Sequence, residues 1–149
     1  KYSLNEIEKI ENTKFDIGVF LTCTDIFRDI KWIKAGIKKL KNNKKIESCF
    51  MGNSTTKNYW HKVNNRWKRL MPHMKYYSSR QEKKKIYRED TGLTCVSRTN
   101  LWRKGKRIGN NVHIIENANT ETYIDIHNEY DLFLAEKTIE FYKLKKTKN

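Results

Sequence analysis

Asp125 and His127 stand two residues apart where the sequence predicts that a strand gives way to a helix. Residues 123–126 place a tyrosine and two isoleucines around Asp125, which is typical of a strand. Asn128 is then a good N-cap, and Asp131 three residues on completes an acidic capping box. Ligands of open α/β sheets bind in the crevice at the carboxyl ends of the strands. We therefore expect Asp125 and His127 to face a ligand site.

The helix predicted from Asn128 must lie on an apolar surface, because its hydrophobic residues recur on one face. These residues are Leu132, Ala135, Ile139 and Tyr142. Earlier in the chain, the sequence predicts a helix from Ser3, a strand over 15–21, a helix over 29–43 and a strand over 46–51. This α-β-α-β order favours an α/β sheet with crossover helices.

Residues 52–92 interrupt this order, and we expect them to form an excursion from the sheet. They mix tyrosine and tryptophan with many basic groups, and Asn64-Asn65 predicts a short hairpin among them. The strand pattern resumes over 93–97. A short helix ended by Gly105 and a strand over 112–115 are predicted to follow.

The composition limits the partners and the compartment. The chain has 149 residues, enough for one domain with a core. Its 32 basic and 17 acidic residues give a net charge of +15, which favours nucleic acid, anionic lipid, or phosphorylated and carboxylated small molecules as partners. No apolar run approaches the roughly 20 residues of a membrane span. The cysteines Cys23, Cys49 and Cys95 form no C-x-x-C pair, which argues against zinc and favours reduced thiols in a cytoplasmic protein.

Five stretches follow one another along the chain: Leu21-Thr-Cys-Thr-Asp-Ile-Phe-Arg28, Ser79-Arg-Gln81, Tyr87-Arg-Glu-Asp-Thr-Gly92, Gly105-Lys-Arg-Ile-Gly109 and Ile124-Asp-Ile-His-Asn-Glu-Tyr-Asp-Leu132. Together they resemble the C-terminal two-thirds of the acylneuraminate cytidylyltransferases, the CMP-sialic acid synthetases. The similarity runs from about Phe15 to Tyr142. It implies a three-layer, Rossmann-like nucleotidyltransferase fold with a mixed sheet. It also implies a single domain over 1–149, in which residues 55–90 are an inserted region that forms a homodimer.

The resemblance implies a reaction in which the anomeric hydroxyl of a nine-carbon 2-keto sugar acid attacks the α-phosphorus of CTP and pyrophosphate leaves, with Mg²⁺ assisting. Asp125 matches the first aspartate of the family's Asp-x-Asp metal pair and is expected to hold Mg²⁺, which prefers hard oxygen ligands. His127 stands at the second position, where imidazole is a poor Mg²⁺ ligand. It is expected to hydrogen-bond a substrate or to help deprotonate the sugar hydroxyl. An ordinary turn is the alternative for both residues.

Further matched positions are expected to bind substrate. Arg80 matches the arginine of the family's Arg-Gln pair, and a guanidinium suits carboxylate or phosphate. The alternative is that Arg80 is one solvated charge among several. Arg28 is expected either to touch the ligand or to pair with Asp25 or Asp29, and Gly92 also suits a tight turn. The remaining expected substrate-binding residues are Thr22, Thr24, Gln81 and Tyr87.

The resemblance places the family's first strand and its Gly/Arg/Lys-rich CTP loop before Lys1, so this chain alone is expected to lack cytidylyltransferase activity. One alternative is a nucleic-acid-binding module that uses Lys38–Lys45, Lys83–Arg88 and Arg103–Arg107 on phosphate. No RRM, zinc-finger or helix-turn-helix signature supports it, which makes nucleic acid the less favoured partner. The other alternative is a non-catalytic module that dimerises through the aromatic residues of 55–90.

Overall fold

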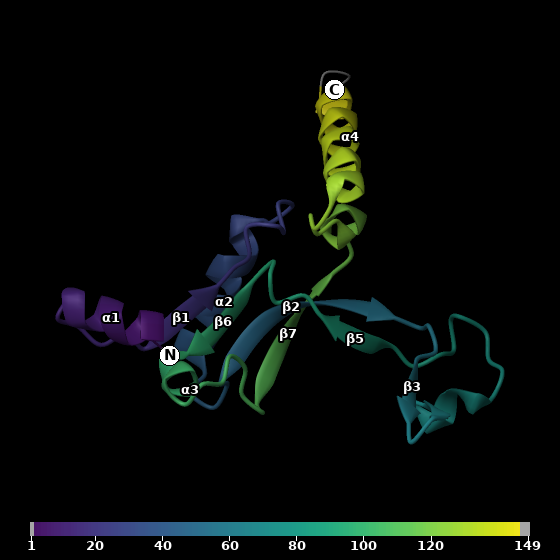
Figure 1. Ribbon diagram of the computed structural model, residues 1–149, viewed down its shortest axis with the longest axis horizontal. Helices are drawn as coiled ribbons and strands as arrows, with labels where there is room; N and C mark the ends of the chain where they lie inside the picture. Colours follow the sequence, from purple (N-terminus) through teal and green to yellow (C-terminus); the bar gives the residue numbers. More distant parts are fainter. Residues whose placement is uncertain (1, 147–149) are drawn as a thin grey trace.

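The computed structural model describes residues 2–146 and places a sheet at the centre of the molecule (Figure 1). The elements in chain order are α1 (Tyr2–Ile10), β1 (Ile17–Phe20), α2 (Ile30–Asn42), β2 (Ser48–Thr55), β3 (Trp60–Val63), β4 (Arg66–Arg69), η1 (Pro72–Lys75), β5 (Ile86–Glu89), β6 (Cys95–Arg98), α3 (Thr99–Arg103), β7 (Val112–Asn117), η2 (Thr120–Tyr123) and α4 (Glu129–Lys146). None of the described helices is long and apolar enough to cross a membrane.

The five-stranded sheet confirms the α/β class with mixed strand directions. β6 lies between β1 and β2 and runs antiparallel to both, whereas β7 runs parallel to β2. β5 pairs antiparallel with the C-terminal half of β2. It follows that β1, β2 and β7 point the same way, so their carboxyl ends share one edge of the sheet, where ligands of such sheets bind.

α2 packs on one face of the sheet and forms the main core there. Asp29, where the predicted helix begins, is its N-cap: the Asp29 side chain accepts a hydrogen bond from the amide of Lys31 at 2.8 Å. Gly36 lets the helix approach closely, since a Cβ at this position would lie 2.7 Å from Val96 Cγ2. The core cluster consists of Leu40, Ile46, Cys49 and Val96, with Ile17, Val19, Ile37 and Ile115 packed against it.

The opposite face of the sheet is covered by α3 and the loop that follows it. A Cβ at Gly18 would lie 2.5 Å from ring atoms of Trp102, so α3 rests directly on β1. The guanidinium of Arg107 lies 4.6 Å from the centre of the Phe20 ring. Gly105, with φ of 75°, follows the end of α3 as predicted.

Glu8 fastens α1 to α3. Its carboxylate is buried and pairs with the guanidinium of Arg103, with Lys14 Nζ at 3.0 Å and with the backbone amide of Phe15 at 3.0 Å. These donors, the Arg103 guanidinium foremost, lower the pKa of Glu8 from 4.5 to about 2. The folded protein therefore holds Glu8 in its charged form more strongly than the unfolded chain does.

We expect the wild-type protein to lose more stability than Glu8→Gln when the pH falls. A carboxyl group with a lowered folded-state pKa stabilises the fold above its unfolded pKa of 4.5, and this contribution is lost as the pH approaches 2. Urea unfolding at about pH 7, 4 and 2.5 measures the effect. Glu11→Gln, which removes an exposed carboxylate beside α1, is the control. Equal acid sensitivity of the wild type and Glu8→Gln would contradict this role of Glu8.

The excursion is shorter than predicted and comprises residues 56–85. Both ends of the predicted segment 52–92 belong to the sheet, because β2 and β5 pair with each other there. The predicted hairpin is confirmed: β3 and β4 flank Asn64 and Asn65, whose φ angles of 48° and 63° suit a type I′ turn. Figure 1 shows the hairpin reaching away from the sheet.

The strand predicted over 123–126 is wrong. The chain instead makes the 3₁₀ turn η2, after which residues 124–126 lie outside the sheet. The hydroxyl of Thr122 donates to the Asn119 carbonyl at 2.6 Å and accepts from the side chain of Asn117 at 2.5 Å. Local hydrogen bonds of this kind compete with strand pairing.

α4 begins as predicted, but most of its predicted apolar face is exposed. Asn128 Oδ1 accepts from the amide of Asp131 at 3.0 Å, and Asp131 Oδ2 accepts from the amide of His127 at 3.0 Å. Of the four apolar residues, Ala135 is buried, whereas Leu132, Ile139 and Tyr142 are 46%, 38% and 39% exposed. The prediction that this face packs on an apolar surface is therefore wrong for the described residues. In them α4 projects away from the sheet (Figure 1).

Candidate functional site

Arg28 ties together two loops at the carboxyl end of β1. Its Nε donates to the carbonyl of Leu93 at 2.7 Å, and its Nη2 donates to the carbonyls of Thr22 at 2.5 Å and Gly92 at 2.8 Å. These bonds use the guanidinium on the protein's own backbone. Arg28 therefore holds the two loops together, and among the described residues it pairs with neither Asp25 nor Asp29.

Thr22 and Gly92 meet where these two loops touch. The amide of Thr22 donates to the Gly92 carbonyl at 3.1 Å, and the Thr22 hydroxyl donates to the carboxylate of Asp25 in a short hydrogen bond. A Cβ at Gly92 would overlap both Asp25 Oδ2 and Thr22 Oγ1. Gly92 is thus required by the close approach of the Thr22–Arg28 loop.

Asp125 and His127 lie against the same loop. The amide of Ile126 donates to the carbonyl of Thr24 at 3.2 Å, which fixes the segment 124–127 beside the carboxyl end of β1. His127 Nε2 lies 2.8 Å from Asp125 Oδ2. The other carboxylate oxygen, Asp125 Oδ1, is buried and has no hydrogen-bond partner among the described residues. The strand prediction failed here, yet the two side chains reach the predicted edge of the sheet.

The oxygen atoms of Asp125 fit a single-carboxylate Mg²⁺ site. Mg²⁺ is commonly held by one or two carboxylates together with substrate phosphates and water. Asp125 Oδ1 is an uncommitted hard ligand, while Oδ2 is occupied by His127. Within residues 2–146, no group of three or more His, Cys, Asp or Glu side chains gathers closely enough to hold a metal unaided. The donor set therefore suits a metal that arrives with a phosphate ligand.

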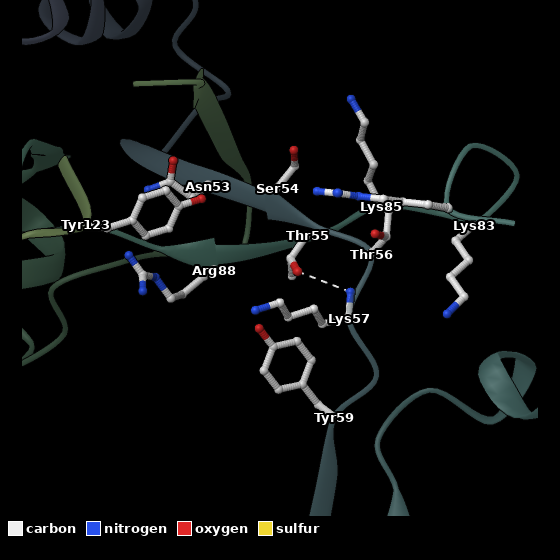
Figure 2. Close-up of a pocket in the computed structure, with 11 residues that line it drawn as sticks. Asn53, Ser54, Thr55, Thr56, Lys57, Tyr59, Lys83, Lys85, Arg88 and Tyr123 are labelled. Carbon is white, nitrogen blue, oxygen red and sulfur yellow. Dashed lines mark hydrogen bonds between the residues drawn. The ribbon is translucent and has the colours of Figure 1, made fainter. Parts of the chain in front are cut away.

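A cleft of about 860 Å³, called the cationic cleft, opens beside the segment 124–127. Its volume is within the range of about 300–1,000 Å³ that is usual for small-molecule sites. Figure 2 shows residues of β2, the excursion and β5 around it. The lining residues are Asn53, Ser54, Thr55, Thr56, Lys57, Tyr59, Arg80, Lys83, Lys85, Arg88 and Tyr123. Five of these side chains are cationic, so the cleft suits an anionic ligand.

Arg88 holds the inner wall of the cationic cleft. Its Nε and Nη2 lie 2.8 and 2.7 Å from Asp90 Oδ1, and its guanidinium lies 5.0 Å from the centre of the Tyr123 ring. Asp90 Oδ2 accepts a short hydrogen bond from the Asn53 side chain. Burial raises the pKa of Asp90 above its usual range, and Arg88 and Asn53 oppose that effect. This network joins β2, β5 and the Tyr123 turn.

Of the other residues expected to bind substrate, only Arg80 lines the cationic cleft. Gln81 is exposed outside it. Tyr87 precedes Arg88 on β5 and so points to the opposite face of the sheet, where its hydroxyl bonds Glu116 and this bond raises the pKa of Tyr87. Thr24 contributes its backbone carbonyl to the Asp125 segment.

Sequence reasoning missed Lys57 and Asn53, and it assigned Lys83–Arg88 to phosphate only in the nucleic-acid alternative. One signal was available: residues 48–81 contain no aspartate or glutamate, so the cations of this stretch have no local counter-ion. Asn53 gave no signal, because its partner Asp90 lies 37 residues away.

Comparison of the sequence with models of protein families and with curated proteins gives no match. The site must therefore be interpreted from its geometry. That geometry combines a carboxylate with a free oxygen, an adjacent imidazole and a cleft suited to an anion.

Proposed function

We propose that the chain is the sugar-acid- and metal-binding part of a CTP-dependent cytidylyltransferase. Its substrates are CTP and a nine-carbon 2-keto sugar acid of the sialic acid kind, and its products are the CMP-sugar and pyrophosphate, for the synthesis of surface glycans. The finer architecture that belongs to this proposal is a Rossmann-like nucleotidyltransferase sheet. The excursion is its inserted dimerisation region.

One observation carries the proposal. The segment from Tyr123 to Ile126 borders both the cationic cleft and the Thr22–Arg28 loop, because Tyr123 lines the cleft and the amide of Ile126 donates to the carbonyl of Thr24. A sugar carboxylate in the cleft and a phosphate at Asp125 would thus be neighbours. Joining a sugar acid to a nucleotide requires these two anions to be held close together.

The side chains then have distinct roles. Arg80 binds the carboxylate of the sugar acid, with Lys57 and Lys85 adding positive charge. His127, oriented by Asp125 Oδ2, accepts the proton of the anomeric hydroxyl through Nδ1. Asp125 Oδ1 is the oxygen available to Mg²⁺, which when bound supplies positive charge against the phosphates.

Calorimetric titration of N-acetylneuraminate into the protein tests the proposal without the need for turnover. We expect saturable binding that persists at physiological salt, where exposed charges more than about 8 Å apart are screened. Cyclohexanecarboxylate, an anion of the same charge, should bind more weakly. Absence of N-acetylneuraminate binding at millimolar concentration would contradict the proposal.

A nucleic-acid-binding module is the second candidate, and the β3–β4 hairpin favours it. Trp60 and Trp67 are 51% and 67% exposed, and Arg69 and Lys62 lie over their rings at 4.2 and 5.7 Å. Basic groups interleaved with exposed aromatic rings suit stacking on unpaired bases. Tight, steeply salt-dependent binding of single-stranded DNA, without N-acetylneuraminate binding, would select this candidate.

The part of the excursion that follows the hairpin is the proposed homodimer contact. Leu70, Tyr76 and Tyr77 are 50%, 68% and 100% exposed in the single chain, which is unusual for large apolar side chains on one segment. Burial of these residues between two copies accounts for their exposure here. A homodimer is compatible with catalysis and with a purely non-catalytic role.

A further inference from the structure

Asn53 is the most deeply buried polar residue that lines the cationic cleft. It lies on β2, is 2% exposed, and its Nδ2 donates to Asp90 Oδ2. Its Oδ1 is shielded from solvent, and no described residue donates a hydrogen bond to it. A buried acceptor without a donor bears the full cost of its lost hydration. Such an atom calls for an explanation.

The neighbouring charges determine that the oxygen of the Asn53 amide, and not its nitrogen, is the atom without a hydrogen-bond partner. Arg88 donates to Asp90 Oδ1 through both Nε and Nη2, so Asp90 acts as an acceptor. The amide must therefore present its NH₂ group to Asp90, since an amide oxygen there would face a carboxylate oxygen. Oδ1 is consequently an acceptor held in a set orientation by β2, β5 and the Asp90 network.

Tyr123 and Arg88 line the cationic cleft together with Asn53. Tyr123 is 50% exposed and stacks on the Arg88 guanidinium at 5.0 Å. Figure 2 shows Tyr123 and Asn53 together at one end of the cleft, with the lysines toward its middle and other end. A ligand whose anionic group meets the lysines would therefore place its other groups at the Asn53 end of the cleft, and contact with the shielded Oδ1 requires the side chains there to shift.

We propose that Asn53 Oδ1 accepts a hydrogen bond from a hydroxyl or amide N–H of a carboxylated ligand in the cationic cleft, and that Asn53 thereby selects polyhydroxylated acids over plain carboxylates. This inference rests on the proposed sugar-acid function and adds to it the residue that recognises the hydroxyl or amide groups of the sugar. The five cations attract any anion, whereas a buried acceptor discriminates, because a ligand without a donor leaves it unpaired.

Quinate and cyclohexanecarboxylate form the matched pair of probes. Both are six-membered rings with one carboxylate, and quinate adds hydroxyl groups. We expect wild-type protein to bind quinate about tenfold more tightly, the effect of roughly one hydrogen bond to a buried acceptor. Asn53→Leu, which cannot accept a hydrogen bond, should reduce this ratio to nearly one. Asn110→Leu, the same change at an exposed site, should retain it.

The outcomes distinguish the role of Asn53 in selectivity from the proposed sugar-acid function. A wild-type ratio near one overturns the role of Asn53 and needs no variant, so the test survives if Asn53→Leu does not fold. A ratio retained in folded Asn53→Leu also overturns it, while N-acetylneuraminate binding would leave the sugar-acid function standing. If neither probe and no N-acetylneuraminate binds, both claims fail. Collapse of the ratio in Asn53→Leu alone supports the inference.

Discussion

Replacing Arg28 by methionine is expected to lower the free energy of unfolding by about 3–5 kcal/mol. The guanidinium donates to the carbonyls of Thr22, Gly92 and Leu93 at 2.5–2.8 Å, and methionine fills similar space without donating. Three backbone carbonyls would then lose a charged donor. Urea unfolding followed by tryptophan fluorescence measures the loss as a shift in midpoint at unchanged slope.

Two further variants make this prediction specific. Arg28→Lys should recover less than half of the lost stability, because an ammonium cannot reproduce the planar fork that spans three carbonyls. Lys38→Met removes an exposed charge from α2 and should change stability by no more than about 0.5 kcal/mol. A loss below about 1 kcal/mol in Arg28→Met would show that the loop is held by other contacts.

Replacing Arg80 by glutamine is expected to weaken N-acetylneuraminate binding by about 10- to 100-fold. A hydrogen bond to a charged partner contributes roughly 1.5–3 kcal/mol, and glutamine keeps the length of the side chain but not its charge or fork. The effect should persist at high salt, because it comes from direct contact and not from the general field of a chain with net charge +15. Calorimetric titration measures both quantities.

Arg66→Gln is the matched control for Arg80. Arg66 lies on β4 of the excursion, carries the same charge and is absent from the lining of the cationic cleft. Its replacement should alter the dissociation constant by less than about twofold at physiological salt. Equal weakening by the two substitutions would mean that the cleft attracts anions only through overall charge.

Local signals predicted the boundaries of several elements correctly. Asn128 was recognised as a helix cap because a short polar side chain before a periodic apolar run has few other roles. Asn64-Asn65 was recognised as a turn because asparagine tolerates the left-handed backbone that a tight hairpin needs. In each case the interaction is complete within a few residues.

Interactions between distant residues were the part that sequence could not predict. β5 was missed because the stretch Ile86–Glu89 carries charge and becomes a strand only through pairing with the far half of β2. Arg28 was expected to touch the ligand or to pair with Asp25 or Asp29. It binds backbone carbonyls up to 65 residues away, and carbonyls have no sequence signature. The strand at 123–126 failed because β propensity there is weaker than the local bonds of Thr122.

The same distinction applies to the site. Asp125, His127 and the Thr22–Arg28 loop were each placed at the edge of the sheet, and the structure brings them together through Thr24 and Ile126. The cleft beside them depends on Asn53, Asp90 and Arg88, which meet only after folding. Tyr87 shows why sequence alone did not predict the lining of the cleft: a one-residue step along a strand moves a side chain to the opposite face of the sheet.

The central claim, that Asp125 holds a metal beside the cationic cleft, is tested most directly by paramagnetic broadening of backbone amide signals. Mn²⁺ accepts the same oxygen ligands as Mg²⁺ and is added in trace amounts in the presence of CTP. We expect broadening centred on residues 22–28 and 124–128, lost in Asp125→Asn and retained in Asp16→Asn, which alters an exposed carboxylate. Broadening centred elsewhere, or unchanged in Asp125→Asn, would contradict the account.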